Sequence, residues 1–133
     1  MKIVLSVIVI CLLFANILAQ STTGRIIGTV SDPGGAVIPG ATIVVTDNQT
    51  KQEKTVTATN DGTFEVPQLV FGTYTVRITA TGYKTFTATD VKIDVGREYP
   101  LNAQLEIGQI SEVVTVTAGA EQINTSNAEL STT

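Results

Sequence analysis

The sequence predicts an all-β protein, specifically a seven-stranded antiparallel β-sandwich. Three observations lead to this fold class. Apolar and polar residues alternate with a period of two from Gly24 onward, which is the pattern of strands with one buried face. Pro-Gly and Asn-Asp-Gly turn signals separate these runs. No stretch keeps a helical period, and short strands joined by such turns are typical of a sandwich.

The stretch GTYTVRITA at 72–80 shows the alternation most clearly. Four of its residues are predicted to point into the core, namely Tyr74, Val76, Ile78 and Ala80. The same pattern predicts strands in 41–47, 62–67 and 99–106, with these residues inward: Ile43, Val45, Phe64, Val66, Leu101, Ala103 and Leu105. Less regular runs at 24–32, 51–59 and 83–95 complete seven strands before Gly108.

Proline before glycine marks two of the predicted turns, DPGG at 32–35 and IPGA at 38–41. Proline presets the φ of the second turn position, and glycine can adopt the positive φ that a type II turn needs. The tripeptide NDG at 60–62 predicts a tight hairpin between two alternating runs. One run carries Lys51, Glu53 and Lys54 together, so we expect a charged edge strand there, which resists pairing with other chains.

The first nineteen residues predict a secretory signal peptide. Lys2 precedes the apolar run IVLSVIVICLLFA, which is shorter than the roughly 17 to 25 residues that span a bilayer. We expect cleavage after the small residue Ala19, so that Gln20 becomes the first residue and 20–23 lead into the sandwich. An uncleaved membrane anchor is the alternative, because only one lysine precedes the run and Ile17 is bulky for its place.

Composition excludes several classes of function. The chain has no histidine, and its single cysteine, Cys11, lies within the predicted leader, so a disulfide framework is not expected. A formal charge of −4, which loss of Lys2 makes one unit more negative, disfavours nucleic-acid binding. Catalytic zinc sites and the Ser/His/Asp or Cys/His nucleophiles use histidine. We therefore expect no enzyme activity, no metal and no cofactor.

Acidic residues leave two minor alternatives. A carboxylate pair for glycoside cleavage could come from four of them: Asp61, Glu65, Asp90 and Asp94. Acidic residues at turns and outward strand positions are, however, normally solvated. Four aspartates near turns lack the close spacing of a dedicated calcium loop, so we expect them to bond their own backbone: Asp32, Asp47, Asp61 and Asp90.

Two stretches, 28–47 and 57–86, resemble the carboxypeptidase regulatory-like domain, a seven-stranded sandwich of the prealbumin-like class. The matching positions are Gly28, Val30, Asp32, Gly35, Pro39 and Gly40 in the first, and Asn60, Gly62, Phe64, Leu69, Gly72, Tyr74, Val76, Gly82 and Tyr83 in the second. The resemblance covers 24–107 and implies the fold, not an activity. Fibronectin-type sandwiches are the rival fold, but they usually carry a core tryptophan, and this chain has none.

Local physics agrees with this resemblance at two corners. Gly40 closes a turn directly before a strand, and Gly72 lets the chain reverse before Tyr74 enters the core. A tyrosine just after such a corner usually bonds its hydroxyl to nearby backbone, so we expect that bond for Tyr74.

After the sandwich, residues 108–133 are predicted to form an extended segment and tail, and the stretch 110–133 resembles the junction between such a domain and the plug in Oar-like TonB-dependent outer-membrane receptors. The residues similar to the TonB box, the peptide that the energising protein grips, are Glu112, Val113, Val114, Thr115, Val116, Thr117 and Ala118. A TonB box works by strand addition. A flexible polar tail is expected to follow it. The alternative is that this run forms an eighth strand, or a strand that covers one sheet edge.

Two other kinds of exported sandwich are weighed against this one. Self-crosslinking adhesin repeats join a first-strand lysine to an asparagine with a glutamate nearby, but the first strand here has Arg25 and 73–83 lack glutamate, so no isopeptide bond is expected. Carbohydrate platforms need exposed aromatics, and the candidates are Phe71, Tyr83, Phe86 and Tyr99.

The resulting hypothesis is a non-catalytic sandwich exported to the periplasm or outer membrane of a Gram-negative-type bacterium. It resembles the periplasmic N-terminal domain of a TonB-dependent transporter, as a fragment or truncated product because the sequence ends at Thr133. The resemblance implies two partners, the TonB C-terminal domain and the plug and barrel of a longer receptor. The alternative is a stand-alone secreted carbohydrate-binding or adhesin-type module.

Overall fold

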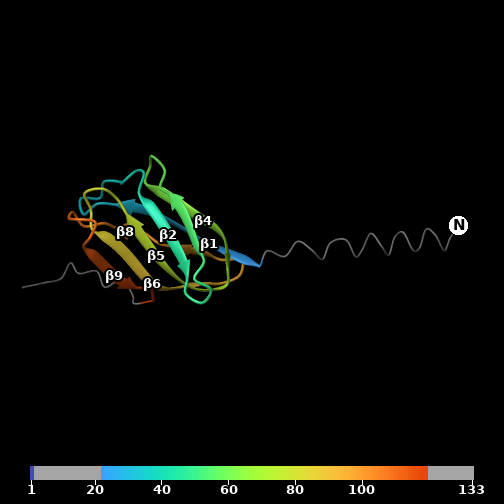
Figure 1. Ribbon diagram of the computed structural model, residues 1–133. Coiled ribbons are helices and arrows are strands. Elements are labelled where there is room, and N and C mark those ends of the chain that lie inside the picture. The colour runs from blue at the N-terminus through green and yellow to red at the C-terminus, as the bar shows by residue number, and fades with distance from the viewer. Residues whose placement is uncertain (2–21, 120–133) are drawn as a thin grey trace, which may run out of the picture.

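The computed structural model describes residue 1 and residues 22–119, which form two β-sheets packed face to face (Figure 1). The predicted all-β sandwich is confirmed. Residues 2–21 and 120–133, which include the predicted leader and most of the predicted tail, lie outside the described residues. The strands are β1 (Thr23–Ser31), β2 (Thr42–Asp47), β3 (Glu53–Thr57), β4 (Thr63–Val70), β5 (Gly72–Thr79), β6 (Thr85–Ile93), β7 (Glu98–Pro100), β8 (Ala103–Gln104) and β9 (Val113–Thr117).

The first sheet has the order β4-β1-β7, with β8 also paired to β1, and the second has the order β3-β2-β5-β6-β9. Most neighbours are antiparallel, as predicted, but β7 and β8 run parallel to β1, and β9 runs parallel to β6. The sheets are therefore mixed. Parallel neighbours need a crossover, and here the chain passes from β6 to the opposite sheet and back before it forms β9.

The core lies between the two sheets and is built from alternate residues of the strands. The inward residues predicted for 72–80 are buried, except that Ala80 is half-buried against the core. The other predicted inward residues are buried as well: Ile43, Val45, Phe64, Val66, Leu101, Ala103 and Leu105. Full burial of an aliphatic side chain contributes about 1.5–3 kcal/mol, so this alternation specifies which face of each strand turns inward.

The predicted strand at 99–106 is divided into β7 and β8, which raises the number of strands before Gly108 from seven to eight. Leu101 sits between them, and its amide donates to the Ile27 carbonyl at 2.8 Å. A Cβ atom at Gly28 would lie 1.8 Å from the Leu101 carbonyl oxygen. Glycine at position 28 therefore allows β1 and the segment around Leu101 to approach each other, which a sequence pattern alone does not reveal.

The predicted turns occupy the expected places, but the hairpin predicted at 60–62 is wrong, because this turn joins β3 to β4, which belong to different sheets and do not pair. Gly40 and Gly82 have φ values of 72° and 87°, and Gly40 follows Pro39 in a turn that ends at β2. Gly62 has a φ of 71° in the turn before β4, and a Cβ there would lie 2.8 Å from the Val37 Cβ. These positions need glycine for its backbone conformation.

Tyr74 makes the corner bond expected of it. Its hydroxyl donates to the Val70 carbonyl at 2.8 Å, across the turn at Gly72 that joins β4 to β5. Burial raises the pKa of Tyr74, with a further increase from the Asp47 carboxylate on the neighbouring strand. The bond fixes the connection between the two sheets, because β4 and β5 belong to different sheets.

Replacing Gly28 by alanine should destabilise the domain by about 1–3 kcal/mol or more, because the added methyl group must push the Leu101 backbone away from β1. Gly34→Ala is the control, since Gly34 is exposed and its Cβ would meet only the Asp32 carboxylate oxygen, at 3.3 Å. Urea unfolding measures both variants. Equal stabilities of the two variants would contradict the close approach at Gly28.

Asp47 predicts a dependence of stability on pH. Its carboxylate accepts hydrogen bonds from the Thr50 amide at 3.0 Å and the Gln49 amide at 2.8 Å. Both bonds lower the pKa of Asp47, and the bond from Thr50 has the larger effect. A carboxyl group with a lowered folded-state pKa stabilises the fold above its unfolded pKa, and this contribution is lost as the pH falls through the folded-state pKa. Asp47→Asn should therefore reduce the unfolding free energy at pH 7.

The deficit of Asp47→Asn relative to the parent protein should shrink as the pH is lowered below about 4. Urea titrations between pH 7 and pH 3 measure this difference. Asp61→Asn in the exposed turn between β3 and β4 is the control and should have little effect at pH 7. A deficit for Asp47→Asn that stays constant over the whole range would show that the charge of Asp47 does not stabilise the turn.

Candidate partner-binding edge

The segment that resembles the TonB box forms β9 at one edge of the five-stranded sheet, beside β6 (Figure 1). Thr85–Thr89 pair with Val113–Thr117 in parallel register. Glu112 immediately precedes β9 and Ala118 follows it. The alternative weighed for this run, a strand that covers a sheet edge, is thus the arrangement in the structure. The second sheet extends beyond the boundary at 107 that was expected for the sandwich.

Lys84 and Thr85 hold the start of this edge strand. The buried Thr85 hydroxyl donates to the Ile110 carbonyl at 2.7 Å, and the Thr85 amide donates to the Glu112 carbonyl at 2.8 Å. The Lys84 ammonium lies 3.0 Å from Glu106 and 3.5 Å from Glu112. Its hydrogen bond to Glu106 and the charges of both glutamates raise the pKa of Lys84. The chain between β8 and β9 is therefore fastened at a few points at the start of β6.

The far end of β9 is held by fewer contacts. The Ala118 amide donates to the Thr89 carbonyl at 2.8 Å. Pairing then stops, and the next residue of β6, Asp90, has a φ of 59° where the register between β5 and β6 shifts. This bulge bends β6 away from a continued ladder, which gives a physical reason for the short length of β9.

The outer edge of β9 has no partner strand within residues 22–119. Backbone groups of a strand alternate in direction, and the hydrogen bonds of the Glu112 carbonyl and the Ala118 amide show that the even-numbered residues point toward β6. Residues 113, 115 and 117 therefore direct their N–H and C=O groups outward. Val113 is 60% exposed and Val116 40% exposed, so β9 presents both unpaired backbone groups and apolar surface.

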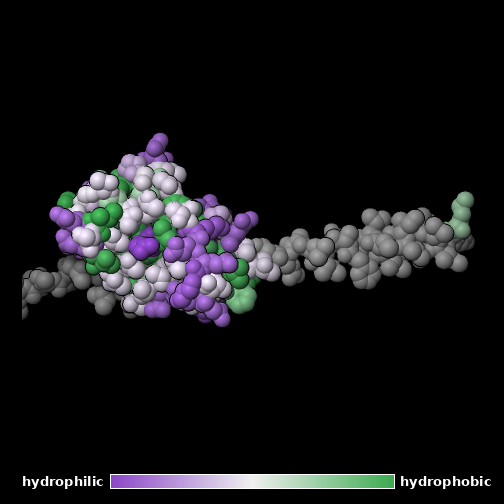
Figure 2. All heavy atoms as spheres, viewed as in Figure 1, coloured by the Kyte–Doolittle hydropathy of each residue, from purple (hydrophilic) through white to green (hydrophobic). Residues whose placement is uncertain are grey.

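An open groove of about 530 Å³ lies between β9 and the segment that carries β7 and β8. Phe86, Ala88 and Leu101 line it from the core, and Val114 and Val116 line it from β9. The inward face of β9 thus covers part of the gap between the sheets without closing it. On the face seen in Figure 2, hydrophobic residues form small separate groups among polar ones.

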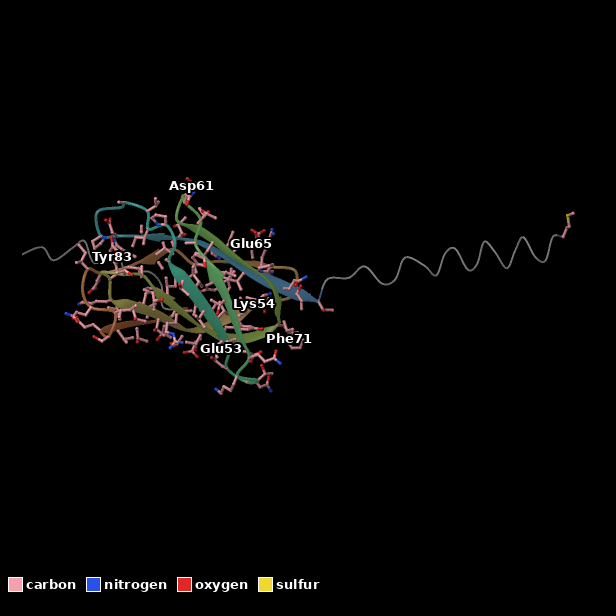
Figure 3. The ribbon with its side chains drawn as sticks, turned by 45° about the horizontal axis from the view of Figure 1, so that its top comes forward. Glu53, Lys54, Asp61, Glu65, Phe71 and Tyr83 are labelled. Carbon is pink, nitrogen blue, oxygen red and sulfur yellow. The ribbon has the colours of Figure 1, made fainter. Side chains whose placement is uncertain are left out.

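The other long edge strands carry charges or proline, which protect an edge from pairing. The predicted edge strand is β3, where Glu53 and Lys54 lie as expected (Figure 3), although Lys51 lies in the preceding turn. Lys54 donates to the Pro67 carbonyl on β4. The edge strand β4 contains Pro67 itself and Glu65, whose carboxylate lies 3.1 Å from Arg25. In contrast, Val113–Thr117 contain no charged residue.

The four aromatic candidates for carbohydrate binding do not come together. Phe71 is 66% exposed at the start of β5, and Tyr83 lies beyond the end of β5, on the opposite side of the domain (Figure 3). Phe86 is buried, and only Tyr99 shares the groove with it. A flat platform of several exposed rings is therefore not formed by these residues.

Two of the four aspartates singled out in the sequence, Asp32 and Asp47, bond to nearby backbone as expected. The Asp32 carboxylate accepts the Ala36 amide at 2.9 Å, and Asp47 accepts two amides in its own turn. Within residues 22–119, no three acidic side chains are grouped so as to hold a metal ion. In the same part of the chain, no helix is long and apolar enough to cross a membrane.

Sequence reasoning did not single out Lys84 and Thr85. Lys84 directly precedes β6 and Thr85 is its first residue, and both bond residues that lie 22 to 28 positions later in the chain. No local pattern encodes such a contact. The exposed Ile110, whose carbonyl accepts the Thr85 hydroxyl, was not predicted as a site residue either.

Among known proteins, this chain is 33% identical over 101 residues to the TonB-dependent transporter Oar of Myxococcus xanthus. The match covers 72% of this chain but only 9% of the transporter. Two solved structures share the fold. A protein from Bacteroides uniformis, provisionally described as carbohydrate binding, aligns at a TM-score of 0.53 and 20% identity, over 62% of this chain and 41% of that chain.

The second structure is the hydroxyquinol 1,2-dioxygenase of Pseudomonas putida, with a TM-score of 0.53 and 12% identity over 68% of this chain and 58% of that chain. Such low identities show a shared fold alone, since one fold carries many functions. The carboxypeptidase regulatory-like domain matches residues 25–106, which hold strands β1 to β8. From this match and the sandwich itself, the chain belongs to the carboxypeptidase regulatory-like domain family.

Proposed function

We propose that this protein is an interaction domain of a TonB-dependent outer-membrane transporter, exported by cleavage of residues 1–19. In this proposal, residues 112–118 are the segment that a TonB C-terminal domain grips by strand addition. The sandwich of 24–107 is a spacer that positions this segment before a plug and barrel. The role is non-catalytic and needs no cofactor.

The observation that carries the proposal is the unprotected edge strand. Val113–Thr117 form an uncharged, β-branched strand at the end of a sheet, and its outer backbone groups meet no strand within residues 22–119. Such an edge is a template for a further strand, because backbone hydrogen bonds supply affinity and alternate side chains supply selectivity. The similarity to a TonB-dependent transporter supports this choice of partner.

The carbohydrate-binding alternative receives less support. Sugar recognition by stacking needs exposed rings that lie side by side, whereas Phe71 and Tyr83 lie on opposite sides of the domain (Figure 3). The likeness to a Bacteroides protein concerns the fold only. We therefore prefer a protein partner for the exposed edge of this domain.

A peptide of residues 109–120 should bind a purified TonB C-terminal domain saturably, with a dissociation constant below about 1 mM. A peptide with proline at both 114 and 115 should bind at least about tenfold more weakly, because it lacks one backbone donor on each edge of the strand. A Thr115→Val peptide keeps both donors and serves as the control. Calorimetric titration measures all three.

Absence of binding by the unmodified peptide at millimolar concentration would contradict the assignment of residues 112–118. Equal affinities of the unmodified and the double-proline peptides would exclude strand addition as the mode of binding, since that mode depends on the backbone donors.

A further inference from the structure

We propose that the edge of β6 is a binding site for the protein's own residues 113–117 and that this site competes with the external partner. Residues 113–117 then exist in a closed state, docked on Thr85–Thr89, and in an open state in which they are free to join another sheet. This inference rests on the proposed function, because the partner it names is the TonB C-terminal domain.

The first support is the small contribution of β9 to the core. Every residue from Val113 to Thr117 is exposed or half-buried, and β6 is the main neighbour of this strand. The strands that hold the core together, such as β2 and β5, bury alternate residues completely. Release of β9 therefore leaves the two-sheet core in place, whereas release of β5 would unfold it.

The second support is that docking on β6 covers some of the backbone groups and side chains that a partner would contact by strand addition. The even-numbered backbone groups of β9 bond β6, and Val114 and Val116 face the groove above Phe86 and Ala88. A partner that inserts alternate side chains into its own pockets needs at least one of these faces. The docked strand offers the outer backbone edge, the side chains of Val113, Thr115 and Thr117, and only part of Val116, whereas Val114 is half-buried.

The third support is the fastening at the start of β6. The side chains of Lys84 and Thr85 fix the turn at 106–112 by one buried hydroxyl bond and two ion pairs whose glutamates are about half-exposed, and the amides of both residues add backbone bonds to Glu106 and Glu112. Exposed ion pairs contribute little, so the Thr85 bond to Ile110 is the main side-chain fastening. Loss of that bond shifts the equilibrium toward the open state without touching residues 113–117.

Competition of this kind has a simple quantitative consequence. If only the open state binds, the measured dissociation constant equals that of the free segment divided by the open fraction. A peptide of residues 109–120 has no β6 edge to occupy. It should therefore bind the TonB domain more tightly than the whole protein does.

A disulfide between positions 87 and 115 tests the closed state directly. Thr87 and Thr115 are register partners on neighbouring parallel strands, which lie about 4.8 Å apart, within the range that a disulfide spans. Apart from Cys11 in the predicted leader, the chain has no cysteine. The oxidised Thr87→Cys/Thr115→Cys protein should lose at least about tenfold in affinity for the TonB domain, and reduction should restore it.

Thr73→Cys/Lys92→Cys is the matched control, because these register partners join β5 to β6 at a distance from β9. Oxidation of this variant should leave the affinity unchanged. A Thr85→Val variant provides an independent test in the opposite direction. It keeps the shape of the buried side chain but lacks the bond to Ile110, and it should bind about fivefold more tightly.

The outcomes separate the two proposals. If the peptide binds and the oxidised 87–115 protein binds as tightly as the reduced one, self-docking as a competitor is overturned, and the partner adds to the outer edge of β9. If the peptide does not bind, the proposed function is overturned together with this inference. Peptide binding, weak binding of the oxidised protein and recovery on reduction support both.

Discussion

Burial of alternate apolar side chains between the two sheets is the interaction on which the rest of the structure depends. Ile26 of β1 packs in the same core as Ile43 of β2 and Ile78 of β5, and all three are fully buried. This core fixes the position of β6, which pairs with β5, and β6 in turn provides the edge on which β9 lies. The edge strand therefore depends on the core, but the core depends little on the edge strand.

Much of this fold could be predicted from the sequence, because each strand has one apolar and one polar face. The alternation in 72–80 and the turn signals at 38–41 and 60–62 were sufficient to place strands and turns, but not the sheet to which each strand belongs, since both turns join strands of different sheets. The break at Leu101 and the parallel pairing of β9 with β6 could not be predicted, since both depend on contacts between distant residues. An alternating run such as 113–117 indicates a strand but not its partner.

The same limit applies to the candidate site. The sequence marked 112–118 by resemblance and left open whether the run is a ligand for another protein or a strand of its own domain. The structure shows it as an edge strand of the domain, and its composition still suits pairing with a further strand. These two descriptions are compatible if β9 can leave β6. The small burial of β9, and its fastening through Thr85 and Lys84 outside residues 113–117, give such a release a specific structural basis.

Hydrogen exchange of the backbone amides tests this separation of core and edge most directly. Amides of 74–78 in β5 should exchange only through global unfolding, whereas those of 114, 116 and 118, which bond β6, should exchange at least roughly tenfold faster through local opening. They should nevertheless exchange more slowly than unstructured amides. Equal protection of the two groups would make β9 an integral part of the core and would contradict the account, as would a complete lack of protection in β9.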